Sequence, residues 1–172
     1  MPITHTSEEP SFPLDFSAIS FLIVDDQPFA RRIVRSMLVG FGSREVYESS
    51  NGAEALELAR AVIPNVIITD LIMPVANGAK LIAMLKAPDS PVRQIPIVVL
   101  SGYLTKTAAL AITNSGADEV LVKPVSPKAL YGHISRIVLR KNQTNVPTSF
   151  LNNQRRRAES DGKKAKNLAY VG

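Results

Sequence analysis

Short apolar runs alternate with longer segments of helical period through the middle of the chain. The runs are mostly continuous and β-branched, which is typical of strands buried on both faces of a parallel sheet. Each run is followed by a segment whose apolar positions recur at helical spacing. Five strands are predicted in this way, at 21–24, 45–48, 66–69, 97–100 and 120–122.

Local signals mark the ends of several of the predicted helices. Pro28 suits the first position of a helix, and Asn51 with Glu54 forms a capping-box pattern. Pro64 ends the segment that Asn51 begins. The predicted helices are 28–39, 51–62, 78–86, 105–115 and 126–141.

Five strand–helix units in succession predict an α/β fold with a doubly wound, five-stranded parallel sheet and five helices. Parallel neighbours need crossover connections, and these crossovers are right-handed. In such a sheet, ligands bind at the carboxyl ends of the strands. The strand ends are therefore the place to look for chemistry.

The two ends of the chain lack this pattern. Residues 1–17 contain three prolines and no sustained period, and we expect a flexible extension there. Residues 143–172 are polar and basic, with too few apolar positions to offset the entropy of ordering, so this tail is predicted to be disordered. Residues 18–142 remain as one predicted domain.

Charge and composition narrow the class of protein. The net charge of +5 arises entirely after residue 140, because 13 basic and 13 acidic residues balance before it. The chain has no cysteine, which excludes disulfides, thiolate metal sites and cysteine nucleophiles. No secretory signal and no apolar run of membrane-spanning length is present, so we expect a cytoplasmic protein with no membrane span.

Polar side chains stand where the predicted strands end: Asp25, Asp26, Asp70, Ser101 and Lys123. Three converging carboxylates repel one another unless a cation offsets them. Hard oxygen ligands without histidine or cysteine favour Mg²⁺, with Mn²⁺ as the alternative. A carboxylate at the centre of such a site is able to attack phosphorus, so the pattern predicts phosphate chemistry.

These residues belong to motifs that occur in a fixed order. They are FLIVDD at 21–26, Asp70-x-x-Met73-Pro74-x-x-x-Gly78, Ser101-Gly102 and Lys123-Pro124. In this pattern the chain resembles the receiver domain of bacterial two-component response regulators, and the run FLIVDDQPFARRIVRSML is especially similar to the chemotaxis-type, stand-alone regulators (CheY-like). The resemblance spans about residues 18–141 and implies a flavodoxin-like fold with strand order 2-1-3-4-5.

The resemblance also implies a role for each residue of the site. Asp70 is the phosphorylated residue, Lys123 pairs with the phosphoryl group, and Ser101 is the hydroxyl that swings toward it. The peptide bond before Pro124 is expected to be cis.

For the Mg²⁺ ion, the resemblance implies four contributors. Asp26 and Asp70 ligate the ion directly, Asp25 acts mainly through a metal-bound water, and Ile72 offers only its backbone carbonyl. No other cofactor is expected.

The chain departs from the family at one switch position. Val120 stands where the family usually has an aromatic residue three positions before the lysine. Tyr103 either substitutes for that aromatic residue or covers the pocket as a loop residue. We expect Tyr103 and Ile72 to flank the phosphoryl group and exclude water, which would prolong the life of the phosphoaspartate.

The function that follows is a single-domain response regulator, a signalling switch rather than an enzyme in the ordinary sense. It would accept a phosphoryl group from a histidine kinase or a phosphotransfer protein onto Asp70. The residues after Lys141 are too few and too polar for an output domain. Output is therefore expected through protein–protein contact at the surface of the fourth helix, fifth strand and fifth helix.

Two alternatives remain. A phosphate sink or phosphorelay intermediate without conformational output is favoured by Val120. A nucleic-acid-binding regulator would act through the basic residues of the tail, which are Arg155, Arg156, Arg157, Lys163, Lys164 and Lys166.

The arginines of the first predicted helix and His133 are assigned no role in the site. We expect Arg31, Arg32 and Arg35 to form a solvated helix face rather than a surface for an acidic partner. His133 is expected to lie on the last helix without a carboxylate partner, so a hydrolase triad has no support.

Overall fold

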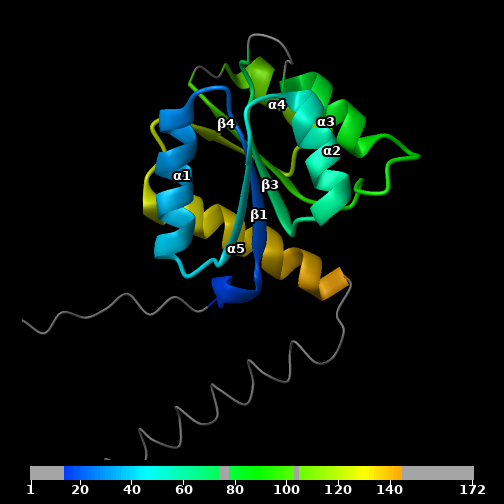
Figure 1. Ribbon diagram of the computed structural model, residues 1–172. Helices are drawn as coiled ribbons and strands as arrows, with labels where there is room; N and C mark the ends of the chain where they lie inside the picture. The colour runs from blue at the N-terminus through cyan, green and yellow to red at the C-terminus, as the bar shows by residue number, and fades with distance from the viewer. Residues whose placement is uncertain (1–13, 74–77, 103–104, 145–172) are drawn as a thin grey trace, which may run out of the picture. The chain divides into compact units, whose positions relative to one another are not determined.

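Five parallel strands form one sheet in the computed structural model of the chain, which describes residues 14–73, 78–102 and 105–144 (Figure 1). The order of the strands is β2-β1-β3-β4-β5. Their bounds are β1 (Ser20–Val24), β2 (Glu45–Ser49), β3 (Val66–Asp70), β4 (Ile97–Ser101) and β5 (Glu119–Val122). The predicted doubly wound sheet and its strand order are confirmed.

Helices cover both faces of this sheet. The helical elements of the described residues are η1 (Phe16–Ala18), α1 (Pro28–Gly40), α2 (Gly52–Val62), α3 (Gly78–Lys86), α4 (Lys106–Asn114) and α5 (Pro127–Thr144). α2 and α3 lie on one side of the sheet and α1 on the other (Figure 1). All five predicted helices occur, with ends that differ from the predicted ones by three residues or fewer.

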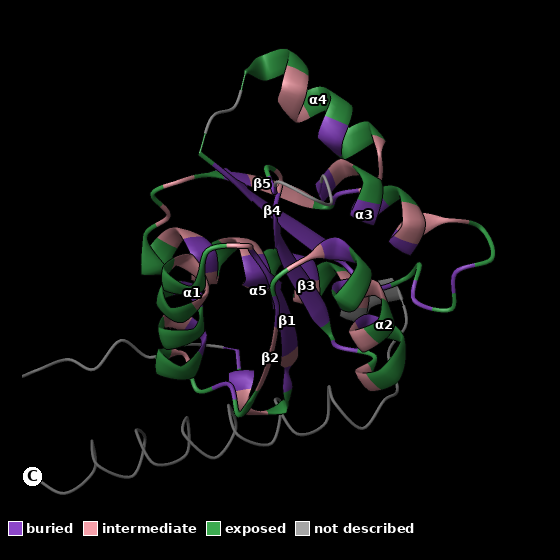
Figure 2. Ribbon diagram, turned by 45° about the horizontal axis from the view of Figure 1, so that its top comes forward, coloured by how far each residue is buried: buried purple, intermediate pink, exposed green. Residues whose placement is uncertain are grey.

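The central strands are buried on both faces, as their continuous apolar runs predict. Every residue of β3 and β4 is buried, and Figure 2 shows these strands at the centre of the fold. Successive side chains of a strand point to opposite faces. Thus Leu22 and Val24 of β1 join the core cluster that includes Ala55 and Ala59 of α2, whereas Ile23 between them does not.

The helix signals in the sequence act as expected. Pro28 is the first residue of α1. The side chain of Asn51 accepts a hydrogen bond from the backbone N–H of Glu54 at 2.9 Å, and Thr105 caps α4 through Ala108 in the same way. In return, the Glu54 carboxylate accepts from the backbone N–H of Ser50. That backbone hydrogen bond lowers the pKa of Glu54.

Residues that the sequence places in the 1–17 extension pack against the sheet. Leu14 is 5% exposed and Phe16 is 1% exposed. The ring of Phe16 contacts those of Phe21, Phe41 and Tyr131 at centroid distances of 5.9, 5.3 and 5.1 Å. The prediction that this part of the extension has no fold is therefore wrong, because aromatic residues far along the chain bury Phe16.

The end of α2 carries a strained residue. Ile63 has φ 46°, in the left-handed region, although it is β-branched, and Pro64 restricts it further. Its side chain is 65% exposed and so contributes little burial. We expect Ile63→Asn to raise the free energy of unfolding by about 1 kcal/mol, because asparagine tolerates this conformation. Urea denaturation measures the gain.

The matched control for that substitution is Val39→Asn in α1. Val39 is also exposed, but its backbone is helical. Asparagine should therefore bring no gain in stability there. Equal gains at the two positions would show that strain at Ile63 is not the cause.

None of the helices in the described part of the chain combines the length and the apolar character that crossing a bilayer requires. Several predictions concern residues outside that part. They are the disorder of the tail beyond Thr144 with its basic clusters, the flexibility of residues 1–13, and the placements of Pro74 and Tyr103.

Candidate functional site

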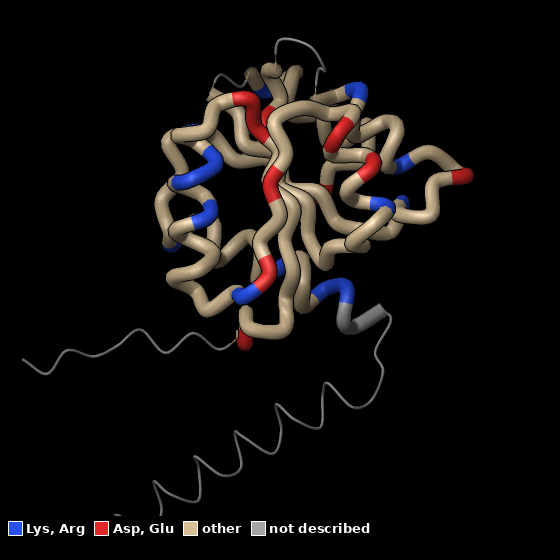
Figure 3. The backbone as a smooth tube through the Cα atoms, viewed as in Figure 1, with Lys and Arg blue, Asp and Glu red and all other residues tan. Residues whose placement is uncertain are grey.

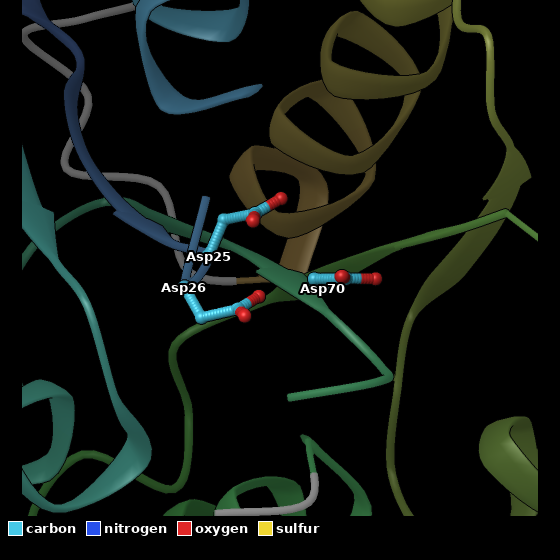
Figure 4. Close-up of side chains that lie close together, drawn as sticks. All are labelled: Asp25, Asp26 and Asp70. Carbon is cyan, nitrogen blue, oxygen red and sulfur yellow. The ribbon is translucent and has the colours of Figure 1, made fainter. Parts of the chain in front are cut away.

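The carboxyl ends of β1 and β3 bring three aspartates together. Asp25 and Asp26 follow β1 directly, and Asp70 is the last residue of β3 (Figure 4). Each offers a carboxylate oxygen, and these oxygens all lie within 4.8 Å of one another. Asp25 and Asp70 are buried and Asp26 is half-buried. Parallel pairing of β1 with β3 places their ends at the same edge of the sheet.

Lys123, which follows β5, supplies the positive charge of this cluster. Its Nζ lies 2.8 Å from Asp25 Oδ2 and 3.4 Å from Asp70 Oδ2. Burial lowers the pKa of Lys123, but the hydrogen bond to Asp25 and the charges of Asp25 and Asp70 outweigh it, so the pKa lies above its usual value. The ammonium therefore stays charged. The Lys123–Pro124 peptide bond is cis, as the resemblance implies.

The hydrogen bonds of the three carboxylates differ. Asp25 Oδ1 accepts from the Gln27 backbone N–H at 2.9 Å, and its Oδ2 accepts from Lys123. Asp70 Oδ1 accepts from the Leu71 backbone N–H at 2.7 Å. Asp26 Oδ1 is buried, yet no described residue donates a hydrogen bond to it.

A buried carboxylate oxygen without a donor is costly unless a cation compensates for it. The cluster also holds three acidic groups in all, and one lysine cannot neutralise them. Their oxygens are the ligand type that Mg²⁺ and Mn²⁺ prefer. The residues present therefore fit a hard divalent cation, and Asp26 has the carboxylate oxygen most available for it.

The other predicted site residues differ in how deeply they are buried. Ser101 is fully buried at the end of β4, and its backbone carbonyl accepts from the Lys123 N–H at 2.7 Å. Ile72 follows the cluster in the β3–α3 loop with its side chain 64% exposed. Val120 is partly buried against the core cluster rather than open to solvent. Tyr103 lies outside the described residues.

An apolar pocket of about 350 Å³ opens beside the site. It lies between the β3–α3 loop and α4, and its lining consists of Leu71, Ile72, Met73, Ala79, Ala108, Ala111 and Ile112. The exposed side chain of Ile72 thus faces this pocket. No charged residue is among the lining residues, so the charged groups of the site are those of the aspartate cluster and Lys123 and not of the pocket.

Of the three arginines in the predicted solvated face of α1, Arg32 and Arg35 are exposed, whereas Arg31 is largely covered. Arg31 is 16% exposed; its Nε donates to Glu48 Oε2 at 3.2 Å and its Nη1 to the Asp25 carbonyl at 2.7 Å. Arg35 Nη1 lies 3.3 Å from Glu48 Oε1 and donates to the Val46 carbonyl. In the sequence, the one signal for these contacts is that Arg31 and Arg35 are spaced i and i+4 on one helix face. That spacing does not identify Glu48 of β2 as their partner.

His133 lies on α5 as predicted, but the expectation that it lacks a carboxylate partner is wrong. His133 Nδ1 lies 2.9 Å from Glu119 Oε2, so it has a carboxylate partner. Sequence separation hides the pair, because Glu119 belongs to β5 and His133 to α5.

Gly78, the last residue of the second motif, lies against the backbone of the site. A Cβ at this position would overlap the Asp70 carbonyl oxygen and lie 2.9 Å from Leu71 Cα. We expect Gly78→Ala to cost on the order of 1–3 kcal/mol of stability, because backbone atoms must move. The same movement displaces Asp70, so chemistry at its carboxylate should slow as well.

Gly132→Ala is the matched control for Gly78→Ala. Around Gly132 in α5, no described atom lies within 4 Å of an added Cβ. Alanine should stabilise that helix by up to about 1 kcal/mol. Thermal denaturation compares the two variants, and a Gly78→Ala protein as stable as the Gly132→Ala protein would contradict the predicted overlap.

Comparison with known proteins places the same region in a known family model. Residues 21–135 match the model of the response regulator receiver domain. Among curated proteins, the chain is similar to the transcriptional regulatory protein SrrA of Staphylococcus aureus, with 34% identity over 128 residues, 74% of this chain and 51% of that protein. The chain thus spans about half the length of the curated relatives it matches.

Solved structures show the same fold. The chemotaxis protein CheY4 of Vibrio cholerae has 30% identity and a TM-score of 0.64, covering 69% of this chain and 97% of that chain. A response regulator receiver domain protein from Clostridium thermocellum has 25% identity and a TM-score of 0.67, covering 74% of this chain and 99% of that chain.

Proposed function

The chain belongs to the response regulator receiver domain family, and on this basis we propose that Asp70 is the residue that accepts a phosphoryl group. Members of this family are phospho-accepting switches that bind Mg²⁺ at an acidic pocket and interact with histidine kinases or phosphotransfer proteins. The observation that carries the proposal is the cluster of Asp25, Asp26 and Asp70 within 4.8 Å, with Lys123 beside two of them.

The transfer is a displacement at phosphorus. A carboxylate oxygen of Asp70 attacks the phosphorus of a phosphohistidine or an acyl phosphate, so that an O–P bond forms. The P–N bond to imidazole or the P–O bond to the carboxylate leaving group breaks, and that group departs with the bonding electron pair, the imidazole then taking a proton. The transferred group carries negative charge into a site that already holds three carboxylates.

The residues of the site would compensate for this negative charge in different ways. Asp26, Asp70 and the backbone carbonyl of Ile72 would hold Mg²⁺, while Asp25 would act through a metal-bound water. When bound, Mg²⁺ neutralises carboxylate and phosphoryl charge. Lys123, already within reach of Asp70, would pair with a phosphoryl oxygen. Ser101 would offer its hydroxyl to another.

Signalling would proceed through contact with a protein partner at the surface of α4, β5 and α5. Leu110 of α4 is 65% exposed and Val122 of β5 is 54% exposed, which gives this surface apolar positions for a partner. That the receiver acts as a single-domain regulator stays a prediction, as does the slowing of hydrolysis by Ile72 and Tyr103.

A phosphate sink or relay intermediate is the second candidate, and Val120 favours it. An aliphatic side chain packed against the core offers no ring whose movement reports phosphorylation on the output surface. Amide hydrogen exchange over α4 and β5, compared before and after phosphorylation, distinguishes the two functions. Changed protection supports a conformational switch, and unchanged protection supports a sink.

The experiment that tests phosphorylation uses a small acyl phosphate with the wild-type chain. Intact-mass spectrometry should show a gain of about 80 Da in the presence of Mg²⁺. Chelation of the metal should prevent the gain, because the aspartate cluster then loses its counter-charge. No gain with Mg²⁺, or an equal gain without a divalent cation, would overturn the proposal.

A further inference from the structure

Arg31 connects the aspartate cluster to the edge of the sheet. Its guanidinium donates to the Asp25 carbonyl at 2.7 Å and to Glu48 Oε2 at 3.2 Å. Glu48 lies on β2, the edge strand next to β1, opposite Ile23 in the register. Figure 3 shows basic residues along α1 and acidic residues along the neighbouring β2. One side chain thus joins three elements.

The Asp25 backbone is held from two sides through these contacts. Its N–H donates to the Ser49 carbonyl at the end of β2, at 3.2 Å, and its carbonyl accepts from Arg31. The Asp25 carbonyl that accepts from Arg31 belongs to the peptide group that joins Asp25 to Asp26. Its orientation therefore sets the direction of both carboxylates relative to Asp70.

The environment makes this contact strong. The Arg31 side chain is 16% exposed, so water competes little for the carbonyl, and the donor is charged. Glu48 fixes the planar guanidinium from the other side, which lowers the entropy lost in holding the Asp25 carbonyl. Arg35 also reaches Glu48, but its second hydrogen bond goes to the Val46 carbonyl of β2, and its side chain is 46% exposed.

We propose that Arg31 is a positioning residue that raises the affinity of the aspartate cluster for a divalent cation by fixing the Asp25–Asp26 peptide. The proposal rests on the function proposed above, because it concerns the same cluster. It assigns to Arg31 a role that its charge alone would oppose, since a nearby positive charge repels a cation.

The sign of the effect separates positioning from charge. If Arg31 acted only as a charge, its replacement by a neutral residue would strengthen Mg²⁺ binding. If it positions the carboxylates, the same replacement weakens binding. Residues that orient metal ligands typically change metal affinity by about 10–100-fold when removed.

The test compares Arg31→Met with Arg35→Met by calorimetric titration of Mg²⁺. Methionine keeps a long apolar side chain and removes the donors. We expect Mg²⁺ to bind about tenfold or more weakly to Arg31→Met, and within about twofold of wild type to Arg35→Met. With an acyl phosphate donor, Arg31→Met should need more Mg²⁺ for half-maximal phosphorylation while its rate at saturating Mg²⁺ approaches that of wild type.

A second measurement uses the metal-free protein. The Gln27 backbone N–H donates to Asp25 Oδ1, so its hydrogen exchange reports the order of the loop. We expect faster exchange in Arg31→Met and unchanged exchange in Arg35→Met. Unchanged or tighter Mg²⁺ binding by Arg31→Met would overturn the proposal about Arg31 alone, whereas wild-type protein that bound no Mg²⁺ would overturn the proposed function with it.

Discussion

An Asp70→Asn protein is expected to gain no phosphoryl group from an acyl phosphate at any Mg²⁺ concentration. The amide is nearly the same size as the carboxylate, so the Leu71 N–H, 2.7 Å from Asp70 Oδ1 in the wild type, keeps an acceptor. The amide oxygen is a far weaker nucleophile than the carboxylate, and the acyl phosphate bond to Asp70 does not form. Intact-mass spectrometry should show the gain of about 80 Da in wild type only.

Asp26→Asn provides the matched control for loss of a carboxylate from the cluster. It removes one metal ligand but leaves the acceptor, so phosphorylation should weaken at low Mg²⁺ and recover as Mg²⁺ increases. Asp70→Asn should not recover. Phosphorylation of Asp70→Asn at high Mg²⁺ would show that another residue accepts the group, and the assignment of Asp70 would be wrong.

The sheet and its helices were predictable because their signals are local. The strand runs at 66–69 and 97–100 are continuous and apolar, and each lies within one residue of an observed strand, β3 or β4. Caps such as Asn51 act through neighbours three residues away. Strand order does not follow from such signals, and it came from the resemblance of the motifs.

The residues of the aspartate cluster were predictable for a topological reason. In a parallel sheet all carboxyl ends lie at one edge, so Asp25, Asp70 and Lys123 had to approach one another once the strands were known. The hydrogen bonds that distinguish Asp25 from Asp26 did not follow from this. They depend on which donors the loop backbone presents.

The contacts of Arg31 and His133 could not be predicted, because their partners depend on register. Glu48 reaches Arg31 only because β2 pairs with β1 so that Glu48 lies opposite Ile23. A shift of one residue would turn the glutamate to the other face. Glu119 meets His133 through the packing of α5 on β5, which no spacing along the chain encodes.

Phe16 escaped prediction for a related reason. The residues around it show no period, so the segment resembles a flexible extension. Its partners, Phe41 and Tyr131, lie far along the chain and meet it only in the folded protein. An isolated aromatic residue carries no sign of such partners. The burial of Phe16 therefore could not be predicted from the pattern of apolar residues around it.

Phe16→Ala is expected to lower the free energy of unfolding by about 3–5 kcal/mol, because it removes a ring that is 1% exposed and contacts three others. Phe29→Ala is the matched control. Phe29 is 72% exposed, so its replacement should lower the free energy of unfolding by no more than about 0.5 kcal/mol. Urea denaturation measures both.

Phosphorylation of the folded Phe16→Ala protein should match that of wild type. Phe16 precedes β1 and the aspartates follow it, so the length of a five-residue strand, roughly 16 Å, separates them. A loss of stability without a loss of phosphoryl uptake, measured at a temperature where the variant remains folded, would show that the aromatic cluster supports the sheet and takes no part in its chemistry. Equal stability of Phe16→Ala and Phe29→Ala would contradict the packing role, since the two variants delete the same side chain from a buried and an exposed position.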